Sequence, residues 1–209
     1  MKTILCYGDS NTWGYIPGTG KRYSYEFRWT TILQRKLGDK FRVLEEGLNG
    51  RTTVWEEPYR PGRNGRLMLY PLLETHSPLN LVVLMLGTND LKHYYSVYGA
   101  DIARGVSILV DIIKKSSTGL NNESPETLLI SPPQIGKLST ELELQFKDAS
   151  EKSHELSAHY ENVASELNCH FINAAKYVVP SIVDGVHLDE EGHEKLADII
   201  FSSVLNIFK

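Results

Sequence analysis

Cysteine is scarce in this sequence of 209 residues, which contains only Cys6 and Cys169. Each lies in a short apolar stretch typical of a buried strand, so we expect reduced thiols in the core rather than a disulfide framework. The first residues also lack the apolar segment and small-residue cleavage site of a signal peptide. Together these features predict a cytoplasmic protein.

Long hydrophobic runs and an excess of one charge are absent as well. The longest apolar run, residues 81–86, is far shorter than the roughly 20 residues that a membrane-spanning helix needs. The 22 basic and 26 acidic residues give a formal net charge of -4 and form no block of like charge. Because phosphate backbones and anionic membranes are bound through basic patches, the sequence predicts neither nucleic acid nor a membrane as a partner.

Five short β-prone segments alternate with helical patterns along the chain. They cover residues 3–7, 41–44, 81–86, 127–131 and 169–172. Such alternation is typical of a parallel sheet, and the third segment is apolar throughout, as in a central strand covered on both faces. We therefore expect one domain, residues 1–209, with an α/β fold of three layers around a flavodoxin-like, doubly wound parallel sheet.

The stretches between the strands carry weaker signals. Apolar residues recur at helical spacing in residues 29–37 and 102–113, and more loosely in residues 141–167. A last helix is predicted to begin near Asp189, whose side chain can cap it. Residues 56–70, with several Pro, Gly and Arg, are interpreted as irregular, either a solvated loop or a contact to a neighbouring subunit in a homo-oligomer.

Glycine and polar residues follow four of the predicted strands, in residues 8–11, 47–50, 87–90 and 184–187. Ligands of an open parallel sheet bind beyond the carboxyl ends of its strands, so we expect these segments to meet at one rim. Together they contain a hydroxyl, an imidazole with a nearby carboxylate, and donors for an oxyanion. This combination is what acyl transfer requires.

Ser10 and His187 are the candidate nucleophile and base. Ser10 directly follows an apolar strand, where a lone serine is more often a helix cap but can also present an exposed hydroxyl. His187 follows Asp184 by three positions, close enough for the carboxylate to hold the Nδ1 proton and leave Nε2 as a general base. The rival pair, Asp189 and His193, has the spacing of a solvated side-chain pair at the start of a helix.

Gly47 and Asn89 are the candidate oxyanion donors. A backbone N–H of a loop glycine and a side-chain amide can both point at an oxygen that becomes negative. Taken singly, each residue is more typical of a turn with unusual backbone angles. Their occurrence together with Ser10 and His187 favours an oxyanion hole.

These blocks resemble the SGNH hydrolases, also called GDSL esterases, a family named for its catalytic Ser, Gly, Asn and His. The four family blocks are matched in chain order by residues 8–10, Gly47, residues 87–90, and Asp184 with His187. The finer match, carried by residues 6–15, 47–53 and 85–91, is to the arylesterase and acyltransferase (perhydrolase-like) branch.

The resemblance implies a five-stranded parallel sheet and a two-step mechanism through an acyl-enzyme, with no metal and no cofactor. It implies that Ser10 is the nucleophile, His187 the base and Asp184 its orienter. It further implies an oxyanion hole made of the Ser10 N–H, the Gly47 N–H and the Asn89 side chain. Members of this branch tend to be oligomers, so a homo-oligomer is among the expectations.

The substrate is expected to be a small carboxylic ester, because the predicted rim lacks a long apolar helix that can serve as a lipid-binding lid. Short-chain acyl or aryl esters come first, and a carbohydrate acetyl ester is the alternative within the same family. Asn11, which stands where the family often has leucine, and Trp13 are expected to contact the substrate.

Two interpretations from other classes stay open at this stage. A flavodoxin-like module that binds a small ligand without catalysis has no need of an imidazole backed by a carboxylate, so Asp184 and His187 count against it. A metal-dependent hydrolase would use Asp9, Asp90 and His187 as ligands. Activity that survives a strong chelator would exclude the metal-dependent interpretation.

Overall fold

The computed structural model describes residues 1–209 and contains one sheet of five parallel strands. The strands are β1 (Lys2–Gly8), β2 (Phe41–Gly47), β3 (Leu81–Met85), β4 (Glu126–Ser131) and β5 (His170–Asn173). Their order across the sheet is β2-β1-β3-β4-β5, which is the flavodoxin-like doubly wound order. The predicted fold class is confirmed, and each predicted strand segment overlaps an observed strand.

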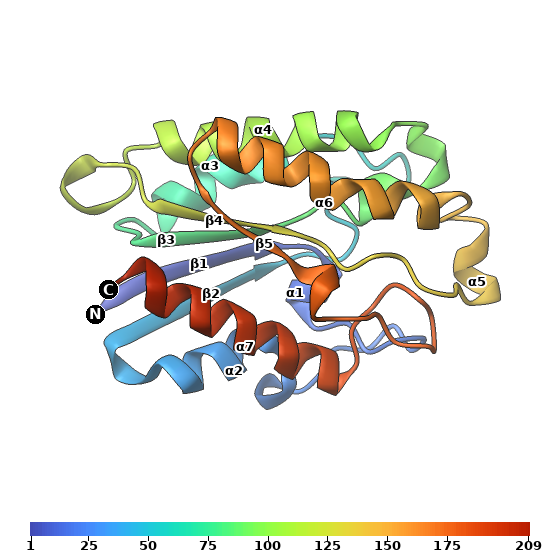
Figure 1. Ribbon diagram of the computed structural model, residues 1–209, viewed down its shortest axis with the longest axis horizontal. Coiled ribbons are helices and arrows are strands. Elements are labelled where there is room, and N and C mark those ends of the chain that lie inside the picture. The colour runs from blue at the N-terminus through green and yellow to red at the C-terminus, as the bar shows by residue number, and fades with distance from the viewer.

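Helices cover both faces of the sheet (Figure 1). They are α1 (Ser10–Trp13), α2 (Trp29–Leu37), α3 (Gly65–Thr75), α4 (Gly99–Lys115), α5 (Thr140–Glu143), α6 (Ala149–Glu166) and α7 (Glu190–Ile207). Figure 1 shows α3, α4 and α6 on one face and α2 and α7 on the other. The two termini lie side by side at one end of the sheet, and the carboxyl ends of the strands lie at the opposite end, near α1 and α5.

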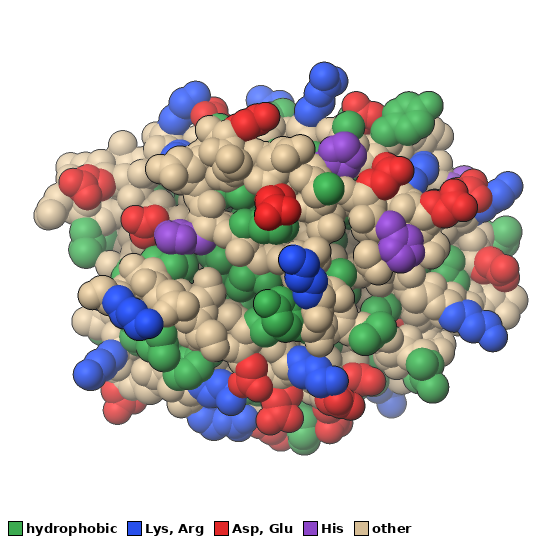
Figure 2. All heavy atoms as spheres, viewed as in Figure 1, with side chains coloured by type: hydrophobic (Ala, Val, Ile, Leu, Met, Phe, Trp, Pro, Cys, Tyr) green, Lys and Arg blue, Asp and Glu red, His purple; other side chains and the backbone are tan.

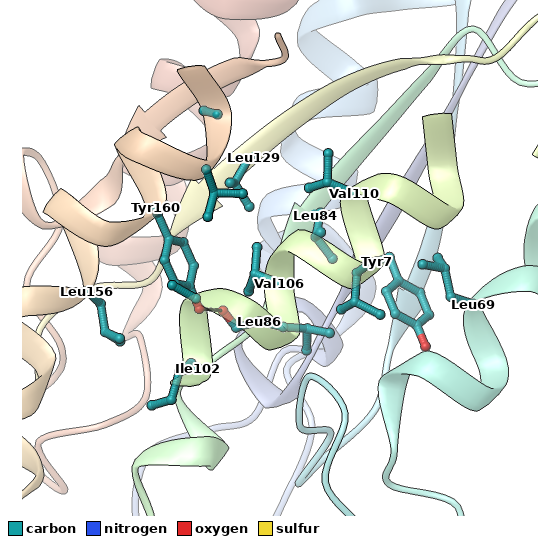
Figure 3. Close-up of a cluster of buried hydrophobic side chains, with 14 of the residues drawn as sticks. Tyr7, Leu69, Leu84, Leu86, Ile102, Val106, Val110, Leu129, Leu156 and Tyr160 are labelled. Atoms are coloured by element: carbon teal, nitrogen blue, oxygen red, sulfur yellow. Dashed lines mark hydrogen bonds between the residues drawn. The ribbon is translucent and has the colours of Figure 1, made fainter. Parts of the chain in front are cut away.

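Two apolar cores lie on the two faces of the sheet, because successive residues of a strand point to opposite sides. In β1, Leu5 and Tyr7 join the core that α3, α4 and α6 cover, whereas Ile4 and Cys6 join the core that α2 and α7 cover. Figure 3 shows part of the first core, with aliphatic side chains between Tyr7 and Tyr160 of α6. Burial of each large aliphatic side chain stabilises the fold by about 1.5–3 kcal/mol, so these cores hold the sheet that carries the strand-end segments.

Two segments differ from the sequence-based expectation. The interpretation of residues 56–70 as irregular was wrong from residue 65 onward, because α3 begins there with the Asn64 side chain accepting the N–H of Arg66 at 3.0 Å. Pro71 inside α3 and the small number of its buried residues hide its helical pattern in the sequence. The stretch 141–167 divides into α5 and α6, and Asp148 between them has a φ of 62°.

Acidic and basic side chains are interspersed over the face of the molecule seen in Figure 2. Lysine and arginine side chains form no stripe there of the kind that tracks a phosphate backbone. None of the helices has the length and hydropathy needed to cross a membrane.

Candidate active site

Ser10 is the first residue of α1, which begins immediately after β1. The side chain of Asp9 caps this helix by accepting the N–H of Asn11 at 3.0 Å. The capping role that a serine often has at such a position is thus taken by its neighbour. The hydroxyl of Ser10 instead lies 3.0 Å from Nε2 of His187.

His187 is held by Asp184 on the side of the ring opposite Ser10. The Nδ1 atom lies 2.8 Å from Oδ2 of Asp184, and Oδ1 of Asp184 accepts the N–H groups of Val186 and His187 at 2.9 Å each. Burial acts to raise the pKa of Asp184, but the hydrogen bonds from His187 and Val186 outweigh it and keep that pKa below its usual value. The ionised carboxylate therefore holds a proton on Nδ1 and directs the lone pair of Nε2 at Ser10.

Tyr15 supports the imidazole from one face. Its ring is stacked on that of His187, with the centroids 4.0 Å apart and the planes inclined by 25°. This contact and the bond to Asp184 fix both the position and the orientation of the base. The sequence marks Tyr15 as an aromatic residue after the first strand but carries no signal for the stacking.

Asn11 and Trp13 do not line the cavity beside Ser10, contrary to the expectation from the sequence. Asn11 is buried and binds the loop that carries His187, donating to the carbonyl of Val186 at 3.3 Å and accepting the N–H of Leu188 at 3.0 Å. Neighbouring residues of a helix point in directions about 100° apart, so only Ser10 of this turn faces the imidazole. Asn11 therefore positions the loop that carries His187.

Gly50, rather than Gly47, reaches the cavity. Gly47 packs against α1 so closely that a Cβ there would lie 2.2 Å from the backbone nitrogen of Trp13. Gly50 has a φ of 81°, in the left-handed region that favours glycine. The N–H groups of Gly50 and Ser10 donate to no other group of the chain, so both are free to bind an oxyanion. The sequence-based choice of Gly47 differs from this arrangement, because the chain turns after β2 and brings Gly50, the second glycine of the segment, to the cavity as the candidate donor.

Asn89 lies at the start of the single 3-10 turn Asn89–Leu91, directly after β3. Its amide nitrogen donates one hydrogen to the carbonyl of Arg51 at 3.1 Å and keeps its second hydrogen for the cavity. Its neighbour Asp90 accepts the N–H of Thr53 at 3.0 and 3.1 Å and also binds the Thr53 hydroxyl. These bonds connect the segment after β2 to the segment after β3, and so hold the amide of Asn89 beside Gly50.

A cavity of about 540 Å³ opens beside these groups, a volume typical of small-molecule sites. Ser10, Gly50, Asn89 and His187 all lie in its wall. Its other polar side chains are Asn49, Glu57, Arg60, Lys92, His93, Glu141 and Gln145, and its aromatic side chains include Tyr15, Tyr59, Tyr94 and Phe146. The arrangement places the candidate nucleophile, the candidate base and three candidate oxyanion donors around one space that can hold a ligand.

Comparison with known proteins identifies the family. The model of the GDSL-like lipase/acylhydrolase family matches residues 6–195. The chain belongs to this family. The membership confirms the resemblance found in the sequence and places this GDSL hydrolase among the carboxylic ester hydrolases.

Solved and curated relatives of this GDSL hydrolase are esterases. The aryl esterase of M. smegmatis is 37% identical over 99% of both chains, with a TM-score of 0.95. Est24, a carbohydrate acetylesterase from Sinorhizobium meliloti, is 35% identical over 99% of this chain and 100% of that chain, with a TM-score of 0.95. An acetylxylan esterase of Xylanibacter ruminicola is 25% identical over 96% of this chain, which spans 42% of that protein's length.

The three residues considered as metal ligands, Asp9, Asp90 and His187, do not converge in this GDSL hydrolase. Asp9 caps α1, Asp90 is bound by Thr53, and His187 faces Ser10. The metal-dependent interpretation built on these residues is therefore not supported by their positions.

His193 is buried in the core of the GDSL hydrolase rather than solvated. Asp189 caps α7 as predicted, accepting the N–H of Gly192 at 2.9 Å. His193, however, is 0% exposed, and its Nδ1 accepts the N–H of Trp29 at 3.3 Å. Burial lowers the pKa of His193 from 6.5 to about 4. The prediction of a solvated Asp189–His193 pair was wrong, because tertiary packing of α7 on α2 encloses the ring.

Replacement of His193 by Asn should make the GDSL hydrolase less sensitive to acid. Below its unfolded pKa of 6.5 the unfolded chain binds a proton that the folded chain does not bind until about pH 4, so stability falls as the pH falls through this window. When the pH is lowered from about 7 to about 5, the free energy of unfolding of the wild type should fall by about 2 kcal/mol more than that of His193→Asn. The Asn side chain retains an acceptor for the N–H of Trp29. Urea unfolding of both proteins at the two pH values measures the difference.

Asp90 also titrates in this pH range, and its effect on stability is opposite to that of His193, but it cancels when the wild type is compared with His193→Asn. Burial raises the pKa of Asp90 from 3.8 to about 6, so the folded chain takes up this proton first and gains stability as the pH falls between those values. Asp90 is unchanged in His193→Asn, and its contribution disappears from the difference between the two proteins. If the free energy of unfolding changed equally with pH in the two proteins, the acid sensitivity could not be assigned to His193.

Proposed function

We propose that this GDSL hydrolase is a serine esterase for small carboxylic esters with short acyl groups, acting through an acyl-enzyme on Ser10. The observation that carries the proposal is the line of contacts from Ser10 Oγ to His187 Nε2 at 3.0 Å and from His187 Nδ1 to Asp184 at 2.8 Å. Nε2 takes the hydroxyl proton while Oγ attacks the ester carbonyl. Asp184 stabilises the imidazolium that forms.

The carbonyl oxygen becomes negative in this step and is bound by the N–H groups of Ser10 and Gly50 and the side-chain amide of Asn89. The imidazolium of His187 then gives its proton to the departing alcohol, leaving the acyl group on Ser10. In the second step His187 takes a proton from the water that attacks the acyl-enzyme, and the imidazolium then returns this proton to Oγ of Ser10 as the acid leaves. An alcohol bound in place of water would receive the acyl group instead, which is acyl transfer.

Replacement of Asn89 by Ala should lower kcat by about 10²- to 10³-fold and change KM little, because the lost donor acts on a charge that develops only in the transition state. Steady-state kinetics with phenyl acetate measure the effects on kcat and KM separately. Gln145→Ala removes another amide from the cavity wall and should leave kcat near the wild-type value. A raised KM with an unchanged kcat would instead assign Asn89 to ground-state binding.

Two substrate classes fit the site. Similarity to an aryl esterase supports short-chain aryl esters. Similarity to a carbohydrate acetylesterase, together with the charged and amide side chains in the cavity wall, supports acetyl esters of polar alcohols. Both classes combine a small acyl group with a larger alcohol, which agrees with a cavity of about 540 Å³.

Mass spectrometry after treatment with a fluorophosphonate tests the proposed nucleophile. We expect a single adduct on the intact protein, mapped by peptide analysis to Ser10, and hydrolysis rates that fall from aryl acetate to butyrate to octanoate. A folded protein that forms no adduct and hydrolyses none of the three esters would favour the non-catalytic binding module.

A further inference from the structure

The cavity wall contains a buried ion pair for which the proposed hydrolysis has no role. Lys92 Nζ lies 3.2 Å from Oε2 of Glu57, and the side chains are 6% and 2% exposed. Both residues line the same cavity as Ser10. A buried ion pair is on average no more stabilising than well-packed apolar residues, because two charges lose their hydration. Its position beside the nucleophile therefore points to a binding role.

Neighbouring side chains hold Glu57 in place. The hydroxyl of Tyr94 donates to Oε1 of Glu57 at 2.8 Å, and Arg60 Nη2 lies 3.7 Å from Oε2. The same Arg60 packs over Gly50, where an added Cβ would lie 2.1 Å from its Nη2. The cluster thus begins at a candidate oxyanion donor and extends along the cavity wall.

The ion pair retains hydrogen-bonding capacity on both partners. An ammonium group has three N–H donors, and that of Lys92 donates to one acceptor of the chain, Glu57. The carboxylate of Glu57 has about four lone-pair sites and accepts hydrogen bonds from Lys92 and Tyr94. A donor and an acceptor are therefore available side by side.

We propose that Glu57 and Lys92, supported by Tyr94, bind free hydroxyl groups on the alcohol part of the ester and thereby decide, between the two proposed substrate classes, for acyl esters of polyhydroxylated alcohols. The proposal rests on the proposed serine esterase activity of Ser10. A hydroxyl group can accept from Lys92 and donate to Glu57 at the same time. An aromatic alcohol would leave both charged groups without new partners.

Two acetates that differ only in their hydroxyl groups test this specificity in the wild-type enzyme. The first is a methyl glucoside monoacetate with its remaining hydroxyls free, and the second is the same monoacetate with those hydroxyls replaced by hydrogen. We expect kcat/KM to be at least about tenfold higher for the free-hydroxyl acetate, since bonds to charged groups contribute to its transition state. Equal values would overturn the proposal without any variant having to fold.

A double variant tests the assignment to the ion pair. Lys92→Met with Glu57→Gln removes both charges together, because either single change leaves an unpaired buried charge. We expect the ratio of kcat/KM for the free-hydroxyl acetate to that for phenyl acetate to fall by about 10- to 100-fold, mainly through KM. The control Lys115→Met breaks a surface ion pair with Asp111 on α4 and should leave the ratio unchanged.

Three results would overturn the proposal. The first is an equal decrease in kcat/KM for the free-hydroxyl acetate and for phenyl acetate in the double variant, which would mean that the ion pair has only a structural role. The second is a preference of the wild type for an acetate that carries a carboxylate over the free-hydroxyl acetate. The third is the absence of any preference between the two acetates.

Fluorophosphonate labelling then separates the two proposals. If Ser10 is labelled but the acetates are not distinguished, only the hydroxyl-binding role is overturned. If Ser10 is not labelled and no ester is hydrolysed, the serine esterase activity is overturned as well.

Discussion

Ser10→Ala is expected to lower kcat for phenyl acetate by about 10⁶-fold and to abolish the fluorophosphonate adduct. Without Oγ no acyl-enzyme can form, and only the oxyanion donors and substrate binding remain to accelerate direct attack by water. The hydroxyl has a single partner in the fold, His187, so circular dichroism and the melting temperature should stay close to those of the wild type. Single-turnover kinetics and intact mass measure the two effects.

Ser131→Ala is a matched control for this change. Ser131 is the last residue of β4 and is buried like Ser10, but its hydroxyl lies 3.5 Å from Asn173 and not near an imidazole. The Ser131→Ala variant should still be labelled on Ser10 by the fluorophosphonate and should hydrolyse phenyl acetate at nearly the wild-type rate. Full activity in Ser10→Ala would show that the reaction does not pass through this hydroxyl.

His187→Ala is expected to reduce kcat by a similar factor, about 10⁶-fold, because the nucleophile and its base act as a unit. Without Nε2 the proton of Ser10 has no acceptor, so fluorophosphonate labelling should be lost although Ser10 is present. The double variant Ser10→Ala with His187→Ala should be no slower than either single variant. Effects that multiply in the double variant would mean that the two residues act independently.

His93→Ala provides the matched control for the imidazole. His93 lines the same cavity, but its Nδ1 lies 3.4 Å from a backbone carbonyl, that of Gln145, and no carboxylate orients its ring. Its loss should change kcat for phenyl acetate by less than about tenfold. If His93→Ala lowered kcat as much as His187→Ala, the assignment of the general base to His187 would be contradicted.

Much of this site follows from local patterns in the sequence. Apolar strands such as residues 81–86 indicate a parallel sheet, and the carboxyl ends of parallel strands meet at one rim. That rule brings Ser10 and Asn89 to one rim, and the long loop between β5 and α7 brings His187 to the same place, although 177 positions separate Ser10 from His187. The pairing of Asp184 with His187 is also local, because a turn places residues three apart within reach of each other.

The parts that the sequence left open or misplaced depend on contacts between distant segments. Gly47 and Gly50 are two glycines of one short segment and cannot be distinguished by residue type. The packing of β2 on α1 and the turn that follows decide which of the two glycines reaches the cavity. The same holds for His193, which is enclosed by α2, and for the pair of Glu57 and Lys92, which come from separate loops.

The sequence by itself determined the family, the five strands, and the segments that carry the candidate nucleophile and base, because periodicity and short spacings are properties of neighbouring residues. The tertiary structure decided which glycine of residues 47–50 faces the cavity, which side chains line the cavity, and which charges are buried there. These properties depend on the directions in which distant backbone segments approach one another, and no local pattern records those directions.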